Sequence, residues 1–141
     1  MISFKGWHLW SLAVFAALAT LALRAELSAR HDFAEAERAR VAGDVSRAIR
    51  HYQYALHWRT PLSNTEERAA EALLAIADDA RVKADRKTEL KALRRLRGGI
   101  LAIRSLGTPM SNRLSLANTR LARVTAEEQI SLGGPTIDGR S

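Results

Sequence analysis

The feature that most constrains this chain is an uncharged apolar run near its N-terminus, residues 7–23, which reads WHLWSLAVFAALATLAL. At about 1.5 Å per residue, a helix of this run is about 26 Å long, close to the roughly 30 Å hydrocarbon core of a bilayer. Trp7 and Trp10 lie at its start, where indole rings favour the headgroup level. The run predicts a transmembrane anchor over residues 1–23, and two alternatives stay open: a cleaved signal peptide and a helix buried in a soluble core.

The basic residues around this run support two opposite orientations in the membrane. Lys5 precedes it, whereas four arginines follow it between residues 24 and 40, which by the positive-inside rule would leave the rest of the chain in the cytoplasm. Acidic residues among those arginines offset them, and a short basic leader is typical of a signal-anchor. We favour a single-pass protein of a bacterial inner membrane with its C-terminal domain in the periplasm.

Small residues recur along the predicted span at helical spacing. Ala13, Ala17 and Thr20 follow one another at intervals of four and three residues. Such spacing lets another transmembrane helix approach closely. Alanine is frequent throughout the chain, so a packing role for these residues and a purely compositional origin both stay open.

The rest of the chain is rich in Ala, Leu, Arg and Glu, with only 8 Gly and 3 Pro in total, which predicts an all-α protein. Nothing breaks the first helix before Gly43, so the anchor is expected to continue through residues 24–42. Later breaks at Pro61, Asp85 and Pro109 predict four more helices. We therefore expect a small antiparallel helical-hairpin bundle over residues 24–130 and a flexible tail over residues 131–141.

Apolar side chains recur at three- and four-residue spacing in each of these predicted helices. Those of the last two are Leu90, Leu93, Leu96, Ile100, Leu101 and Ile103, then Leu114, Ala117, Leu121 and Val124. The pair Gly98-Gly99 lies inside the first of these stripes and is expected to weaken that helix by roughly 1 kcal/mol per glycine.

The segment up to Pro61 resembles a tetratricopeptide repeat. Gly43 matches the turn between the two helices, and Ala48, Tyr52 and Ala55 match the small, aromatic and small positions of the second helix. The first helix departs from the family, because Asp32, Glu35, Ala36 and Ala39 stand where it has Trp, Leu and Gly or Tyr.

A degenerate second copy spans residues 69–96, with Ala84-Asp85 in place of Gly43-Asp44. It is offset by 41 residues rather than the family's usual repeat length. The resemblance implies a helical-repeat scaffold that binds proteins, and it implies no catalytic residues.

Positive charge is concentrated in residues 81–123, whereas residues 24–80 are slightly acidic. Such a region attracts anionic partners, and we expect membrane-protein subunits or lipid headgroups before nucleic acid, because no aromatic stacking platform accompanies it. Arg94, Arg95 and Arg97 are its candidate contacts. Tyr54 and Trp58 share a helix face and are the candidate aromatic contacts, unless they pack on the domain's own core.

No residue pattern predicts an enzyme. The chain has no cysteine, which excludes disulfides and thiolate chemistry. His51 and His57 are six residues apart and cannot share a helix face, and the acids between residues 66 and 79 have no nucleophile beside them. We expect no catalytic residue, no cofactor and no metal.

These observations favour a non-enzymatic, membrane-anchored accessory or assembly subunit of a larger bacterial envelope complex. One alternative is a peptide-binding adaptor with a groove near Tyr54 and Trp58. A further alternative is a cytoplasmic nucleic-acid-binding protein that uses residues 81–123.

Overall fold

The computed structural model describes residues 4–58, 63–103 and 110–131, with only the backbone described for residues 4–9 and 103. The fold class predicted from the sequence is confirmed in its coarse form, because the described residues form an all-helical bundle. Its helices are α1 (Phe4–Val41), α2 (Val45–His57), α3 (Thr65–Val82), α4 (Arg86–Ile103) and α5 (Ser111–Ser131).

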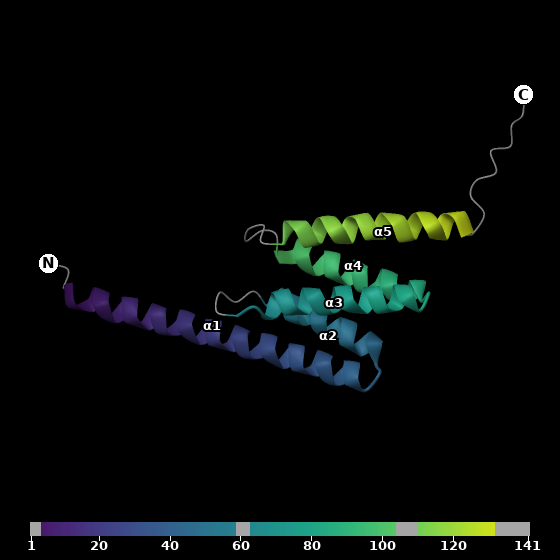
Figure 1. Cartoon of the computed structure of the whole chain (residues 1–141). Helices are drawn as coiled ribbons and strands as arrows, with labels where there is room; N and C mark the ends of the chain where they lie inside the picture. Colours follow the sequence, from purple (N-terminus) through teal and green to yellow (C-terminus); the bar gives the residue numbers. More distant parts are fainter. Residues whose placement is uncertain (1–3, 59–62, 104–109, 132–141) are drawn as a thin grey trace, which may run out of the picture.

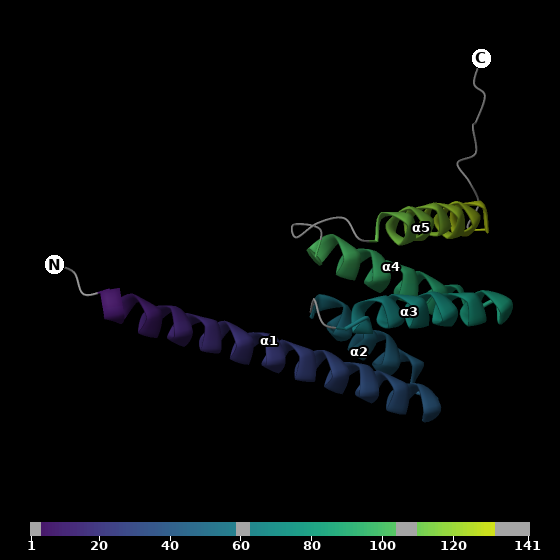
Figure 2. The ribbon, with the colours of Figure 1, turned by 60° about the vertical axis from the view of Figure 1, so that its left-hand side comes forward.

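Consecutive helices run antiparallel, and α1 projects well beyond the others (Figure 1). The second half of α1 forms a hairpin with α2, α3 forms a second hairpin with α4, and α5 packs on α4. The hairpins join mainly through α2, which contacts both α3 and α4. In both views the N-terminal half of α1 extends away from the bundle on its own (Figure 2).

Helix α1 is one continuous helix with two different surroundings. No glycine or proline interrupts it after Gly6, and the helix runs from the apolar run through to Val41 without a break. Every described residue from 10 to 21 is exposed, whereas Glu26, Ala29, Ala36 and Ala39 are buried. The small side chains of the three buried alanines allow neighbouring helices to lie close, so the packed half of α1 begins just after the apolar run ends.

The two hairpin turns have the same backbone geometry 41 residues apart. Gly43 and Ala84 both adopt the left-handed region, with φ of 77° and 56°. The next residue's amide donates back to Ala39 O in the first turn (2.9 Å) and to Ala80 O in the second (2.8 Å). The side chains of Asp44 and Asp85 then cap α2 and α4 by accepting from Arg47 N (2.9 Å) and Thr88 N (3.1 Å). The two hairpin turns are therefore equivalent in backbone geometry and in their capping aspartate.

The core forms along the helix faces that the sequence pattern indicates, with two corrections. Leu90, Leu93, Leu96 and Ile100 of α4 are buried, but Leu101 is exposed because α4 has no described neighbour on that side. Of the pair Gly98-Gly99, Gly99 has a packing role besides its cost in helix propensity. A Cβ on Gly99 would lie 2.9 Å from Leu56 Cδ1, so the bare glycine is what lets α4 approach α2 this closely.

Helix α5 has no described partner after it. Ala117 and Val124 are buried, Leu114 and Leu121 pack partly against the core, and the opposite side of the helix is exposed. The helix extends to Ser131. It stands where the first helix of a third hairpin would lie, and it covers the apolar side of α4.

Candidate partner-binding surfaces

The first candidate surface is the apolar half of α1. Its large side chains point in all directions and are more than half exposed: Trp10, Leu12, Val14, Phe15, Leu18, Leu21 and Leu23. By length and composition the helix can cross a membrane, and a signal sequence has the same properties. Only 11% of its most apolar 18-residue stretch is buried against the rest of the protein. No described neighbour covers this surface.

The predicted contacts for neighbouring transmembrane helices lie within it. Ala13, Ala17 and Thr20 are exposed. The Thr20 hydroxyl donates to Ala16 O at 2.8 Å, so this polar group is satisfied inside the helix and needs no water. Trp10 is exposed, and the side chain of Trp7 lies outside the described residues.

The residues expected to pack a first repeat lie in the hairpin of α1 and α2. Ala48, Tyr52 and Ala55 are fully buried between α1 and the following helices, and Gly43 makes the turn. Pro61 lies outside the described residues.

Tyr52 has neighbours on α1 that the sequence pattern did not predict. Its ring meets Phe33 edge-on at 5.5 Å, and its hydroxyl donates to Glu37 Oε1 at 2.5 Å. Burial, with this hydrogen bond to a carboxylate, raises the pKa of Tyr52 to about 12. Arg68 of α3 stacks over the same Phe33, 4.5 Å from the ring centre, so one aromatic side chain joins three helices.

Tyr54 and Trp58 are half exposed, at 46% and 41%, on the outer side of α2. The Trp58 indole N–H donates to Asp32 Oδ2 at 3.1 Å, and His51 Nδ1 lies 3.6 Å from the other oxygen of that carboxylate. Tyr54 contacts the His51 ring edge-on at 5.9 Å. The two aromatics thus partly serve the chain's own packing through Asp32, whose place in the repeat pattern gave no sign that it would be their partner.

The second candidate surface is a basic groove on α4, with a volume of about 710 Å³. Its lining residues are Arg86, Lys87, Leu90, Lys91, Arg94, Arg95 and Glu128. The acid of α4 itself, Glu89, is only 5% exposed on the inner side of the helix, so the exposed charge of α4 is all positive.

The groove cations are held mainly by neutral partners. Lys91 donates to Ser46 Oγ at 2.9 Å, and Arg95 donates to Gln53 Oε1 at 2.8 Å, both on α2. Arg86 lies 3.8 Å from Glu127 on α5. Within the described part of the chain, neither Lys87 nor Arg94 forms an ion pair. Two of the three arginines expected to contact a partner, Arg94 and Arg95, line this groove, and Arg97 does not.

The basic charge of α5 is used differently, which corrects the expectation of one basic region over residues 81–123. Arg113 pairs with Glu71 at 2.7 Å and Arg120 pairs with Asp78 at 2.6 Å, so α5 is held on α3 by its arginines. Two of the acids of α3 therefore have a structural role. The positive charge that lines the groove therefore comes from α4.

Among the described residues no group of three His, Cys, Asp or Glu side chains could hold a metal ion. Comparison with known proteins finds no matching family model, no matching curated protein and no matching solved structure, so the chain is assigned to no family.

Proposed function

We propose that this chain is a single-pass membrane protein whose helical hairpins form a protein-binding scaffold, and that it acts as a non-enzymatic accessory or assembly subunit of a bacterial envelope complex. The observation that carries the proposal is the apolar half of α1, which is exposed around its whole circumference while the other half of the same helix is packed. Soluble proteins rarely expose an apolar surface this large and continuous.

A buried core helix and a cleaved signal peptide both fit this arrangement less well than an anchor does. A buried core helix would lie among other helices, and this half lies outside the bundle (Figure 1). A signal peptide would be cut near Ala22, in the middle of a continuous helix and directly before the residues that pack on α2. Retention leaves the helix intact and places the bundle immediately outside the bilayer.

The scaffold part of the proposal rests on the two equivalent hairpins. Their matching turns and the buried small–aromatic–small set of α2 support a tetratricopeptide-like repeat. Stacked helical hairpins leave extended surfaces to which other proteins bind. Ala13, Ala17 and Thr20 would then face transmembrane helices of the partner subunits, and the bundle would lie in the periplasm.

Extraction of membranes at alkaline pH tests the anchor. The wild-type chain should stay in the pellet with the intact mass of the full sequence. The variant V14R/L18R should move to the soluble fraction, because each arginine in the middle of a span costs about 3 kcal/mol. The matched control is L27R/V41R, since Leu27 is as exposed as Leu18, both at 59%, but lies beyond the apolar run. Release of the wild type, or equal release of both variants, would contradict the proposal.

Topology and assembly need separate measurements. A reporter that is active only outside the cytoplasm, fused to the C-terminus, should be active. In mild detergent extracts of native membranes the chain should migrate with companion proteins, and migration as a lone monomer would remove the subunit role while leaving the anchor intact.

A further inference from the structure

The groove on α4 stands out because the fold makes little use of its charge. Five cations line it, and two of them, Lys87 and Arg94, form no ion pair within the described residues. They lie seven residues apart, two helical turns or about 10 Å along α4. Leu90 lies between them and lines the floor of the groove, where 7% of it is exposed.

The chain's own acids are largely engaged elsewhere. Glu26 and Glu35 of α1 pair with Arg30, Arg38 and Arg47, Glu71 and Asp78 of α3 pair with arginines of α5, and Asp44 and Asp85 cap helices. A second copy of this chain therefore offers the groove few exposed acids without an ion pair of their own, among them Glu67 and Asp79 of α3. A segment of a different protein is the better match for the charge of the groove.

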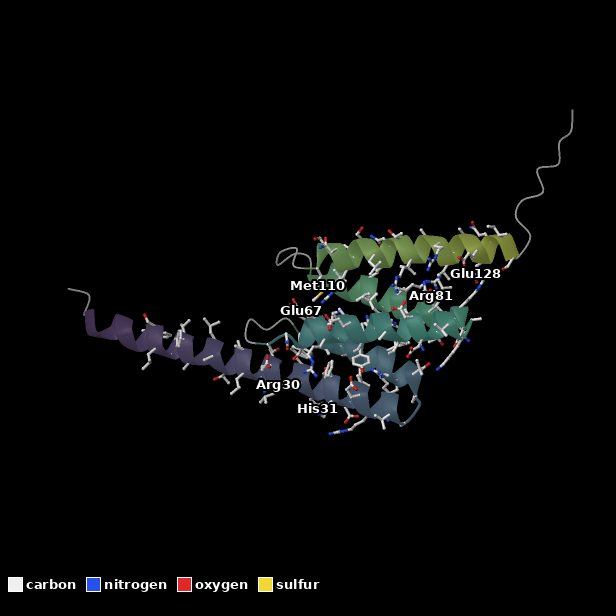
Figure 3. All side chains as sticks on the ribbon, in the orientation of Figure 1. Arg30, His31, Glu67, Arg81, Met110 and Glu128 are labelled. Carbon is white, nitrogen blue, oxygen red and sulfur yellow. The ribbon has the colours of Figure 1, made fainter. Side chains whose placement is uncertain are left out.

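The position of the groove argues against membrane lipid. Helix α4 begins at the end of the bundle farthest from the N-terminus of α1, where Figure 3 places Arg81 and Glu128, while Glu67 and Met110 lie at the near end. If the bilayer ends near Arg24, the 24–41 half of α1 carries the far turn about 26 Å away from it. Lys87 then lies roughly 25 Å and Arg94 roughly 15 Å from the headgroups, beyond the screening length of about 8 Å at physiological salt.

The lining also differs from that of a nucleic-acid site. Single strands are bound by basic grooves that carry aromatic side chains for base stacking. No aromatic residue is among the described residues that line this groove. Tyr54 and Trp58 lie on α2 and are partly engaged with His51 and Asp32.

We propose that this groove binds an acidic segment of a partner protein, with carboxylates about two helical turns apart on either side of an apolar residue. The inference rests on the proposed function and names the chemistry of the partner. Carboxylates of the segment would pair with Lys87 and Arg94, and its apolar side chain would contact Leu90. Glu128 on the α5 side repels such a segment and so confines it to the α4 side.

The test uses the full chain in discs of neutral lipid and a fluorescein-labelled helical peptide that carries glutamates two turns apart around a leucine. Fluorescence anisotropy should show binding that weakens as salt is raised. The same peptide with glutamine in place of glutamate should bind about tenfold more weakly, because charge complementarity supplies the attraction.

Variants localise the effect. K87E/R94E should lower the affinity for the acidic peptide by about tenfold or more, and E128Q should raise it about twofold. The matched control is R81E/R97E, which makes the same change in net charge at two exposed arginines outside the groove and should change the affinity less than about twofold. Thermal unfolding followed by circular dichroism checks that the variants fold.

Several outcomes would overturn the inference. Equal losses in the two double variants would mean a response to net charge alone. Tighter binding of a single-stranded oligonucleotide, lost in K87E/R94E, would make the occupant a nucleic acid. A marked loss of peptide binding in discs of anionic lipid would make it a headgroup. None of these results bears on whether α1 stays in the membrane, so the inference can fail while the proposed function stands.

Discussion

The two hairpins of this protein have the same turn geometry, but the carboxylates at one pair of equivalent positions bind different partners. Glu37 in the first and Asp78 in the second are equivalent positions, 41 residues apart. Glu37 accepts a hydrogen bond from the buried Tyr52, whereas Asp78 pairs outward with Arg120 of α5. The equivalent of Tyr52 is Leu93, which has no donor to offer. When the interior donor is absent, the acid instead joins the hairpin to the next helix.

The largest expected effect comes from replacing Tyr52 of the first hairpin with leucine, the residue at the equivalent position of the second hairpin. Y52L removes the donor to Glu37 and the edge contact with Phe33 from a fully buried site. We expect a loss of about 2–3 kcal/mol in the free energy of unfolding, because both a hydrogen bond to a carboxylate and packing are lost. Denaturant unfolding of the full chain in mild detergent, followed by circular dichroism, measures this.

The control for Y52L is Y54L, at a half-exposed tyrosine two residues away, which should change the stability by less than about 0.5 kcal/mol. The pH dependence gives a second check. The folded-state pKa of Tyr52 is about 12, above its ordinary value of 10.0. Its contribution is therefore fully present below pH 10 and is lost as the pH rises towards 12. Y52L should lack this alkaline loss, and equal alkaline sensitivity in both proteins would contradict the role of Tyr52.

The second prediction tests the contact between the hairpins. Gly98 and Gly99 are neighbours in α4, but a Cβ would meet nothing within 4 Å at Gly98 and would meet Leu56 Cδ1 at 2.9 Å and Cβ at 3.2 Å at Gly99. G98A should stabilise the protein by up to about 1 kcal/mol through helix propensity. G99A should forfeit that gain and destabilise by about 1 kcal/mol because Leu56 must move.

Thermal unfolding of both glycine variants gives the comparison directly. Since helix propensity favours both changes equally, any difference between them measures the contact with Leu56. An equal rise in stability for G98A and G99A would mean that α2 and α4 do not approach this closely.

The third prediction exchanges the turn residues. Gly43 and Ala84 both have positive φ, a region that costs a residue with a side chain roughly 1–2 kcal/mol. G43A should therefore destabilise by about 1 kcal/mol, and A84G should stabilise by somewhat less, since glycine also increases the entropy of the unfolded chain. Opposite signs in the measured free energies are the result to look for, and a loss in A84G would mean that the second turn is not left-handed.

Periodicity and breakers were enough to predict an all-helical chain with a long apolar helix at its N-terminal end and shorter helices after it. They work because helix propensity and the spacing of apolar residues are local properties. Even the degenerate Ala84-Asp85 turn was found from the sequence, because Asp85 caps α4 as Asp44 caps α2.

The candidate surfaces were harder to predict, because they depend on which helices become neighbours. The net charge along the sequence assigned Arg113 and Arg120 to the same basic region as Arg94. In the structure these two arginines of α5 instead pair with acids of α3. From the sequence, Gly98 and Gly99 were expected only to weaken their helix. In the structure Gly99 lies against Leu56 of α2. Sequence order gives no sign of either pairing, since the partners are more than 40 residues apart.

The smallest expected effect concerns the capping aspartates of the two hairpins. D85A removes the acceptor for Thr88 N and should lower the melting temperature by a few degrees, and D44A should do the same at α2. The hydrogen bonds from Thr88 hold the pKa of Asp85 below its ordinary value of 3.8. Because the folded-state pKa is lowered, the contribution of Asp85 is present above about pH 4 and is lost as the pH falls through that lowered pKa.

The melting temperatures of wild type and D85A should accordingly converge in acid. At neutral pH D85N, which keeps an uncharged acceptor, should lower the melting temperature less than D85A does. A gap between wild type and D85A that stays constant into acid would mean that the Asp85 charge does not contribute. In that case the two turns would share their backbone conformation without sharing the charged cap that makes the second one an equivalent of the first.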